Sequence, residues 1–357
     1  MEAPNRYVQG PGTADRIGEI AGQFGDRFFV FGDEIVLSFL GERVARSLQE
    51  AHKISMMETF QGECCYPEIF RLSQKAESHN AQVIVGMGGG KTVDTAKAIS
   101  IQLRRPVVIV PTIASTDAPA SHVVMVYEEN HVIKEVLRMK PVPSLIVVDT
   151  EVIAQAPVRF LISGMGDALS TRFEAEACWK SGAFNVFGGK PCQASLHLSR
   201  LSYEIIREYG QEAIASVCSK KVNSALENVV EANVLLSALG FENCGLAAAH
   251  AVETGLSAME EMRHSLHGER VAYGILIQLV LEKREPTELR DMIGFYKAVG
   301  LPIRLKELGL EASSMGRIEK AVDIICRKGS LLYNMPFAID RDMLIESINV
   351  VESFPLN

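Results

Sequence analysis

The chain has 357 residues, of which 47% are hydrophobic, and it carries a formal net charge of −8. This length suggests about two domains, and the acidic balance argues against a nucleic-acid-binding surface or a face for anionic membranes. The start, Met-Glu-Ala-Pro, has no signal-peptide pattern, and the apolar runs are about half of what spans a bilayer. Seven cysteines without a CxxC pair fit reduced thiols in a cytoplasmic protein.

Strand and helix patterns alternate over the first 158 residues. After an extended segment at 5–11, strands are predicted at 27–31, 53–60, 83–85, 106–110 and 145–148, helices at 13–24, 35–51, 66–78 and 92–100, and a hairpin at 121–127 and 131–137 around Glu128–Asn130. Apolar β-branched strands between amphipathic helices are typical of a parallel sheet covered on both faces. The pattern therefore predicts a Rossmann-like α/β domain.

A glycine turn inside this region is the strongest local motif. The strand 83–85 runs into Gly86-Met-Gly-Gly-Gly90, and helical spacing follows from Thr92. A P-loop is excluded because Val85 occupies the position of its first glycine, and the dinucleotide fingerprint fails because Lys91 replaces its third glycine. Glycines before a helix N-terminus still favour a bound anion, so a pyrophosphate site of a third kind is predicted. The alternative is a tight turn that binds nothing.

Two further polar positions follow predicted strands. Asp33 comes just after strand 27–31, where such a carboxylate often holds an adenosine ribose and favours NAD over NADP, although it can instead cap the next helix. The stretch Pro111–Ser121 is rich in hydroxyl groups and contains Asp117. It follows strand 106–110 and is expected at the ligand-binding edge of the sheet, the alternative being a solvated loop.

The second part of the chain has few strand signals. Helical patterns lie at 167–180, 190–208, 211–217, 222–239, 245–258, 269–282, 287–299, 315–325 and 341–351. We therefore predict an α/β domain at 1–158 and an all-helical domain at 159–357, with the chemistry in a cleft between them.

Three residues of the helical part are candidate metal ligands. Asp167 follows Gly164-Met-Gly166, His250 lies among alanines, and His267 precedes a predicted helix. On one straight helix the two histidines would be about 25 Å apart, so they meet only if the chain turns back between them. Two imidazoles and one carboxylate leave one position open, as catalytic zinc requires. The alternatives are a helix cap at Asp167, a hydrogen-bonded core histidine, and His264 as a rival ligand.

Several motifs, in order, are similar to those of one enzyme family. They are 88–97 (GGGKTVDTAK), 111–119 (PTIASTDAP), 164–169 (GMGDAL), 250–252 (HAV) and 267–274 (HGERVAYG). The chain resembles the glycerol dehydrogenases of the iron-containing, metal-dependent alcohol dehydrogenase superfamily over almost its whole length. The resemblance implies the dehydroquinate-synthase-like fold of group III alcohol dehydrogenases, in which an NAD-binding α/β domain precedes an all-helical domain.

The resemblance also implies roles for particular residues. It implies one zinc ion per subunit on Asp167, His250 and His267, and a substrate contact at Asp117. It implies cofactor contacts at Asp33, Gly89, Gly90, Lys91, Asp94, Thr112, Ser115, Thr116, Ser121, Val123 and Tyr127. A polyol substrate and a homo-oligomer, often an octamer, are expected, without nucleic-acid or membrane partners.

Two departures from the family pattern bear on the site. Iron-using relatives carry a further histidine four residues after the aspartate, where this chain has Thr171, which favours a three-ligand zinc site. Glu253-Thr254 follows His250-Ala-Val, where glycerol dehydrogenases have His-Asn, so the substrate preference is open.

The expected reaction is NAD-dependent oxidation of glycerol or a related 1,2-diol to a hydroxyketone, with water or His264 relaying the proton. The alternatives are a dehydrogenase for hydroxycarboxylates or other polyols, a dehydroquinate-synthase-like lyase, and a non-catalytic NAD-binding protein.

Overall fold

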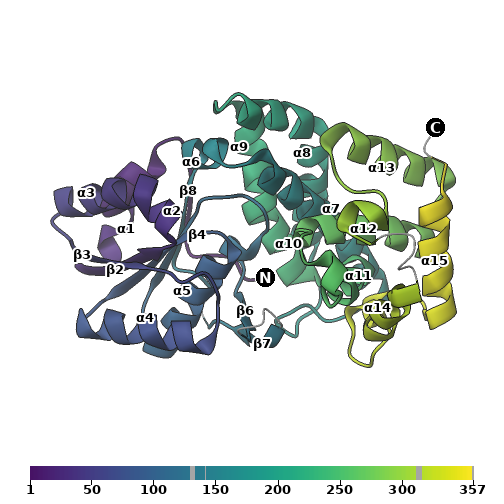
Figure 1. The fold of residues 1–357 in the computed structure, drawn as a ribbon, viewed down its shortest axis with the longest axis horizontal. Coiled ribbons are helices and arrows are strands. Elements are labelled where there is room, and N and C mark those ends of the chain that lie inside the picture. Colours follow the sequence, from purple (N-terminus) through teal and green to yellow (C-terminus); the bar gives the residue numbers. More distant parts are fainter. Residues whose placement is uncertain (129–132, 141, 311–315, 356–357) are drawn as a thin grey trace. The chain divides into compact units, whose positions relative to one another are not determined.

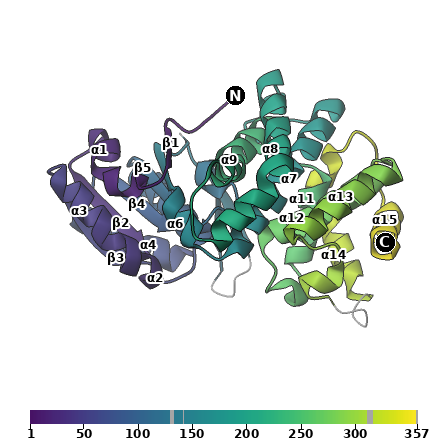
Figure 2. The ribbon, with the colours of Figure 1, turned by 90° about the horizontal axis from the view of Figure 1, so that it is seen from above.

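The computed structural model describes residues 1–128, 133–140, 142–310 and 316–355. These residues form two compact units. The sheet unit contains residues 2–157 and 215–234, and the helical unit contains Met1, 158–214 and the chain from Leu235 onward. Figures 1 and 2 show the chain from two directions, with the sheet in purple, blue and teal and the later helices in teal, green and yellow.

The sheet unit is built on six strands paired in parallel, in the order β1-β8-β5-β4-β2-β3. The strands are β1 (Tyr7–Gly10), β2 (Arg27–Gly32), β3 (Ile54–Thr59), β4 (Val83–Gly88), β5 (Val107–Pro111) and β8 (Leu145–Asp149). Along the chain, β3 pairs with one side of β2, and β4 then pairs with the other side of β2. The order therefore reverses between β2 and β4, and in an open parallel sheet ligands bind beyond the strand ends at such a point.

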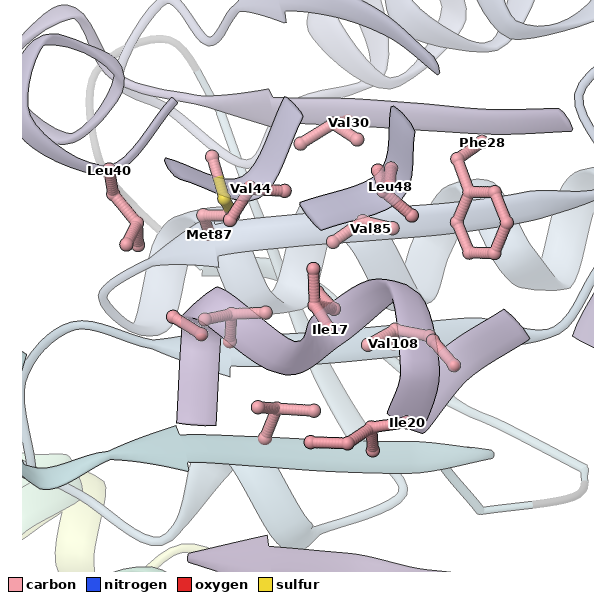
Figure 3. Packing of buried hydrophobic residues seen from close by; sticks show 14 of the residues in the cluster. Ile17, Ile20, Phe28, Val30, Leu40, Val44, Leu48, Val85, Met87 and Val108 are labelled. Carbon is pink, nitrogen blue, oxygen red and sulfur yellow. The ribbon is translucent and has the colours of Figure 1, made fainter. Parts of the chain in front are cut away.

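Helices cover both faces of this sheet. They are α1 (Ile17–Ala21), α2 (Glu34–Val36), α3 (Glu42–Glu50), α4 (Tyr66–Ser78), α5 (Gly90–Leu103) and α6 (Thr150–Gln155). Alternate strand residues such as Val30, Val85 and Val108 pack against α1 and α3 in one buried cluster (Figure 3). The opposite face meets α5, because a Cβ added at Gly86 would lie 2.5 Å from the Ala96 side chain. Burial on both faces explains why β2, β4, β5 and β8 have largely continuous apolar sequences rather than alternating ones.

The predicted hairpin forms a separate antiparallel pair, β6 (Val123–Tyr127) and β7 (Ile133–Arg138). Most of its predicted turn, and the predicted start of the second strand at His131, lie outside the described residues.

Residues 215–234 belong to the sheet unit although they follow the first helices of the helical unit. They are attached by long-range hydrogen bonds. The Gln9 amide donates to Glu227 Oε2 at 2.7 Å, and the Asn233 amide donates to Ala114 O at 3.0 Å. The sequence predicts a single boundary along the chain, because contacts between residues so far apart leave no local pattern.

The helical unit confirms the predicted all-α second part. From residue 158 onward the described α-helices are α7 (Val158–Ser181), α8 (Gln193–Cys218), α9 (Ser224–Glu231), α10 (Ser237–Cys244), α11 (Ala248–Ser257), α12 (His267–Leu281), α13 (Pro286–Val299), α14 (Ile318–Ile325) and α15 (Arg341–Ser353). Of these, α9 lies within residues 215–234 and so belongs to the sheet unit. The start of the helix predicted at 315 lies outside the described residues.

Two of these helices are longer than the sequence predicts. α7 begins nine residues before Asp167, and α8 continues through Gly210, where a break is predicted. A Cβ at Gly210 would lie 2.6 Å from Met165 Cε. Gly210 thus makes room for the Met165 side chain of α7. It does not end α8, the helix that contains it.

Within the described residues, no single helix is long and apolar enough to cross a bilayer, although Ser224–Cys244 and Ala248–Ser257, bent by 105°, meet that criterion as a pair.

Candidate functional site

Asp167, His250 and His267 converge within the helical unit. They come from α7, α11 and α12, and one ligand atom from each lies within 4.8 Å of the others. Nε2 of each histidine lies 3.4 Å from Asp167 Oδ1. Two imidazole nitrogens and one carboxylate oxygen at this separation fit a divalent cation such as zinc.

Glycines allow these helices to approach closely enough for the three side chains to meet. A Cβ at Gly268 would lie 1.8 Å from Ser163 O of α7, and a Cβ at Gly166 would lie 2.4 Å from Gly268 O. A Cβ at Gly274 would lie 2.3 Å from Ala249 O of α11. α12 is therefore in backbone contact with both helices that carry the other ligands.

A carboxylate orients each histidine from behind. His250 Nδ1 lies 2.6 Å from Glu174 Oε2, and His267 Nδ1 lies 3.2 Å from Glu253 Oε1. Because each Nδ1 faces a carboxylate, each Nε2 is directed to the common centre beside Asp167. This carboxylate–histidine arrangement is typical of metal sites and fixes the ring orientation of the ligand.

The charges of the cluster are balanced only with added positive charge. Asp167, Glu174 and Glu253 bring three negative charges, and the guanidinium of Arg270, which donates to Glu253 Oε1 at 2.8 Å, offsets one of them. Two negative charges remain, which one divalent cation or two imidazolium protons would neutralise. Burial alone would lower the pKa of His267, but Glu253 and Asp167 outweigh it and raise that pKa to about 9. Burial likewise opposes protonation of His250, but Glu174 and Asp167 raise its pKa well above the ordinary value.

The structure separates the alternatives at these positions. Asp167 is 1% exposed inside α7, so it is not a helix cap, contrary to its predicted place at a helix start. His264 is exposed and is not part of the cluster formed by the described residues. Thr171 lies one turn beyond Asp167, and its hydroxyl donates to Ala168 O at 2.8 Å.

Two residues of this cluster escaped the sequence reasoning. Glu174 lies seven residues after Asp167 and therefore on the same face of α7, which is a usable signal. Arg270 follows His267 by three residues, and its guanidinium also donates to Ser265 O at 2.6 Å. In the sequence Glu253 stands out only as a departure from the family pattern, and its contact with His267 is a result of tertiary packing.

The glycine turn lies at the reversal point of the sheet. β4 ends at Gly88, whose φ of 156° is rarely adopted by residues with a side chain, and α5 begins at Gly90. A Cβ at Gly90 would meet no atom within 4 Å. Open space at a helix N-terminus leaves its N–H groups accessible to an anion, as expected for a pyrophosphate.

Asp33 and Lys91 flank this turn. Asp33 follows β2, whose Gly32 pairs with Met87, and its carboxylate accepts a hydrogen bond from Val36 N at 2.9 Å. Asp33 therefore caps the next helix, while its position beside the reversal point is where a ribose contact is expected. Lys91 Nζ lies 2.7 Å from Glu63 Oε2 and 5.8 Å from the centre of the Tyr127 ring.

The remaining predicted cofactor and substrate residues lie in or near the segment after β5. Thr112 N donates to Gly88 O at 3.1 Å, so this segment starts beside the glycine turn. Ser115, Thr116 and Asp117 are half-buried, and Ser121 is 2% exposed. Asp94, which the resemblance places among the cofactor contacts, is 6% exposed, and its carboxylate accepts from Met125 N at 3.1 Å.

The chain is similar to known proteins over most of its length. The model of the iron-containing alcohol dehydrogenase family matches residues 4–150. The glycerol dehydrogenase of Citrobacter freundii is 43% identical over 340 residues, which cover 95% of this chain and 93% of the relative. That of Thermotoga maritima is 45% identical over 334 residues, covering 93% and 91%. The crystal structure of the Schizosaccharomyces pombe glycerol dehydrogenase is 35% identical with a TM-score of 0.95, covering 99% of this chain and 90% of that one.

These relatives match almost the entire chain and confirm the resemblance found in its motifs. The chain therefore belongs to the iron-containing alcohol dehydrogenase family, and it is an NAD-linked alcohol oxidoreductase.

Proposed function

We propose that this chain oxidises glycerol and related 1,2-diols to dihydroxyacetone and related hydroxyketones, with NAD as the hydride acceptor and one zinc ion per subunit. The observation that carries the proposal is the grouping of Asp167, His250 and His267 within 4.8 Å. The names of the full-length relatives, glycerol dehydrogenases from two bacteria and a fission yeast, support glycerol as the substrate.

The donor set supports zinc as the metal. Asp167, His250 and His267 would hold it, and Glu174 and Glu253 would keep the imidazoles in place. Thr171 stands where iron-using relatives carry a further histidine, so the proposed site has three protein ligands. A position is thus left for the substrate, as a catalytic zinc site requires.

Different residues of the chain would have different roles in this reaction. When bound, zinc supplies Lewis acidity that lowers the pKa of a coordinated hydroxyl, as it lowers that of water from about 16 to about 7. Asp117 would accept a hydrogen bond from a polyol hydroxyl and so orient the carbon that loses its hydride. Gly89, Gly90 and Lys91 would hold the pyrophosphate of NAD, which accepts that hydride.

One rival activity fits the site less well, and a second differs in its products. A hydroxycarboxylate substrate needs a cationic group for its anion, whereas the segment after β5 offers the carboxylate of Asp117 between hydroxyl groups. A lyase with the same cofactors would produce no net NADH, so its reaction is easily distinguished.

The direct test is a screen of polyols and hydroxyacids by NADH absorbance, before and after chelation and zinc repletion. We expect activity with glycerol that disappears with chelator and returns with zinc. His267→Ala is expected to abolish this activity together with stoichiometric zinc, while His264→Ala keeps the zinc; a loss of turnover in His264→Ala would identify His264 as the proton relay. Glycerol oxidation by a zinc-free His267→Ala protein would refute the proposed site.

We also propose a homo-oligomer in the cytoplasm, for which the family resemblance implies eight subunits. All seven cysteines are free, which suits a reducing compartment. Large exposed apolar side chains, including Ile35 at 76% and Phe70 at 56%, suit burial between subunits. Light scattering of the purified protein tests the assembly, and a monomer would contradict it.

A further inference from the structure

Lys97 has an unusual environment for a lysine. Its side chain is 0% exposed on α5, and its ammonium lies among four oxygen atoms. Nζ donates to Ala118 O at 2.6 Å and to Val123 O at 2.9 Å, with Ser121 Oγ and Asp94 Oδ1 each at 3.4 Å. Burying an ammonium is costly unless hydrogen bonds and an opposite charge compensate it, and here both are present.

Lys97 and its ion-pair partner Asp94 both make hydrogen bonds to the same segment, residues 118–125. Lys97 binds the backbone oxygens of Ala118 and Val123, and Asp94 accepts from Met125 N on its second oxygen. Asp94 and Lys97 are three residues apart and so lie on one face of α5. This face therefore holds residues 118–125 through backbone groups, whose positions do not depend on side-chain rotamers.

A second buried polar residue holds the other end of the same segment. Asn233 is 0% exposed, and its amide donates to Ala114 O at 3.0 Å. Between Ala114 and Met125 lie the residues expected to contact the nicotinamide and the polyol: Ser115, Thr116, Asp117, Ser121 and Val123. We call residues 114–125 the ligand segment.

We propose that Lys97 is a positioning residue for cofactor binding, which sets the ligand segment against α5 and acts together with Asp94 and Asn233. The proposal rests on the proposed function, because it concerns the NAD site. It assigns Asp94 an indirect role in place of the direct cofactor contact implied by the family resemblance. One helix then serves both parts of the cofactor site, since α5 presents the glycine turn at its N-terminus and anchors the ligand segment two turns later.

The test measures NADH affinity by fluorescence, and kcat and KM for NAD, in Lys97→Gln and Lys97→Arg. Lys97→Gln loses the charge and at least one donor, so we expect NADH affinity to fall and KM for NAD to rise by about tenfold or more, with zinc content unchanged. Lys97→Arg keeps the charge and several donors, and partial rescue is expected. A folded Lys97→Gln protein with wild-type NADH affinity would overturn the proposal.

Two further variants complete the design. Lys53→Gln breaks another lysine–aspartate pair of the sheet unit, that with Asp26 at 2.7 Å, and is expected to leave NADH affinity unchanged. If Lys97→Gln does not fold, Asn233→Ala provides the test, because it removes one hydrogen bond to the ligand segment without leaving a buried charge. A folded Asn233→Ala protein with unchanged NADH affinity and polyol KM would then reject the proposal. Failure of the wild-type protein to bind NADH would instead reject the proposed function.

Discussion

Gly268→Ala is a stringent test of how the metal site is built. The added Cβ would lie 1.8 Å from Ser163 O, 2.7 Å from Ser163 C and 3.0 Å from Asp167 N. A carbon and a carbonyl oxygen approach to about 3.3 Å at closest, so α12 and α7 would have to separate by about 1.5 Å. His267 and Asp167 lie on these two helices, and metal–ligand distances tolerate changes of only about 0.2 Å.

Two opposing effects determine the outcome for stability. Replacing a helical glycine by alanine stabilises by about 0.5–1 kcal/mol, but inserting a methyl group into a closed helix contact costs about 1–3 kcal/mol. The clash is with backbone atoms, which cannot rotate away, so we expect a net loss. Since the ligands are also displaced, zinc affinity should fall at least about tenfold.

The assay combines zinc competition with a chromophoric chelator and thermal unfolding with and without zinc. Gly294→Ala is the matched control, because this glycine lies inside α13, where a Cβ would meet nothing within 4 Å. It should stabilise the protein slightly and leave zinc binding unchanged. Stoichiometric zinc and wild-type unfolding in Gly268→Ala would refute the reasoning from helix contact.

Other predictions concern charges at the two sites. Glu253→Gln removes the carboxylate charge behind His267 and should lower zinc affinity about tenfold, measured by chelator competition; an unchanged affinity would show that Glu253 has no part in metal binding. Because the pKa of His267 is raised to about 9 and that of His250 is also raised, zinc must displace their protons at neutral pH. Zinc affinity should therefore increase as the pH rises toward about 9 and decrease as it falls, by up to about 100-fold per pH unit while both rings are protonated; equal affinities at about pH 6 and pH 8 would contradict this. Asp33→Asn keeps the helix cap but removes the negative charge, so relative use of NADP, measured as the ratio of kcat/KM values, should increase about tenfold, and an unchanged ratio would exclude Asp33 from cofactor selection.

The glycine turn illustrates what local sequence is sufficient to predict. A short β-branched strand, four glycines and a helical pattern predict β4 and α5 within a few residues, because each feature acts on the backbone near it. Asp33 could likewise be placed after its strand. Its role as a helix cap is also predictable, because the hydrogen bond from Val36 N to the Asp33 carboxylate spans only three residues.

The helical part shows where such reasoning ends. The sequence pattern predicts a helix that begins at Asp167, just after Gly164 and Gly166, but α7 runs through both glycines. In a tertiary contact a glycine permits a neighbouring backbone to approach, and the sequence does not distinguish this role from a helix end. The start of α7 was therefore misplaced.

Patterns in the amino-acid sequence are sufficient to predict the two fold classes, the strand–glycine–helix turn and the three candidate ligands. They do not predict that Asp167, His250 and His267 meet, that Glu174 and Glu253 lie behind the two imidazoles, or that residues 215–234 join the sheet unit. Secondary structure follows from the periodicity of neighbouring side chains, whereas these contacts join residues far apart in the chain, and their distances depend on how closely whole helices can pack.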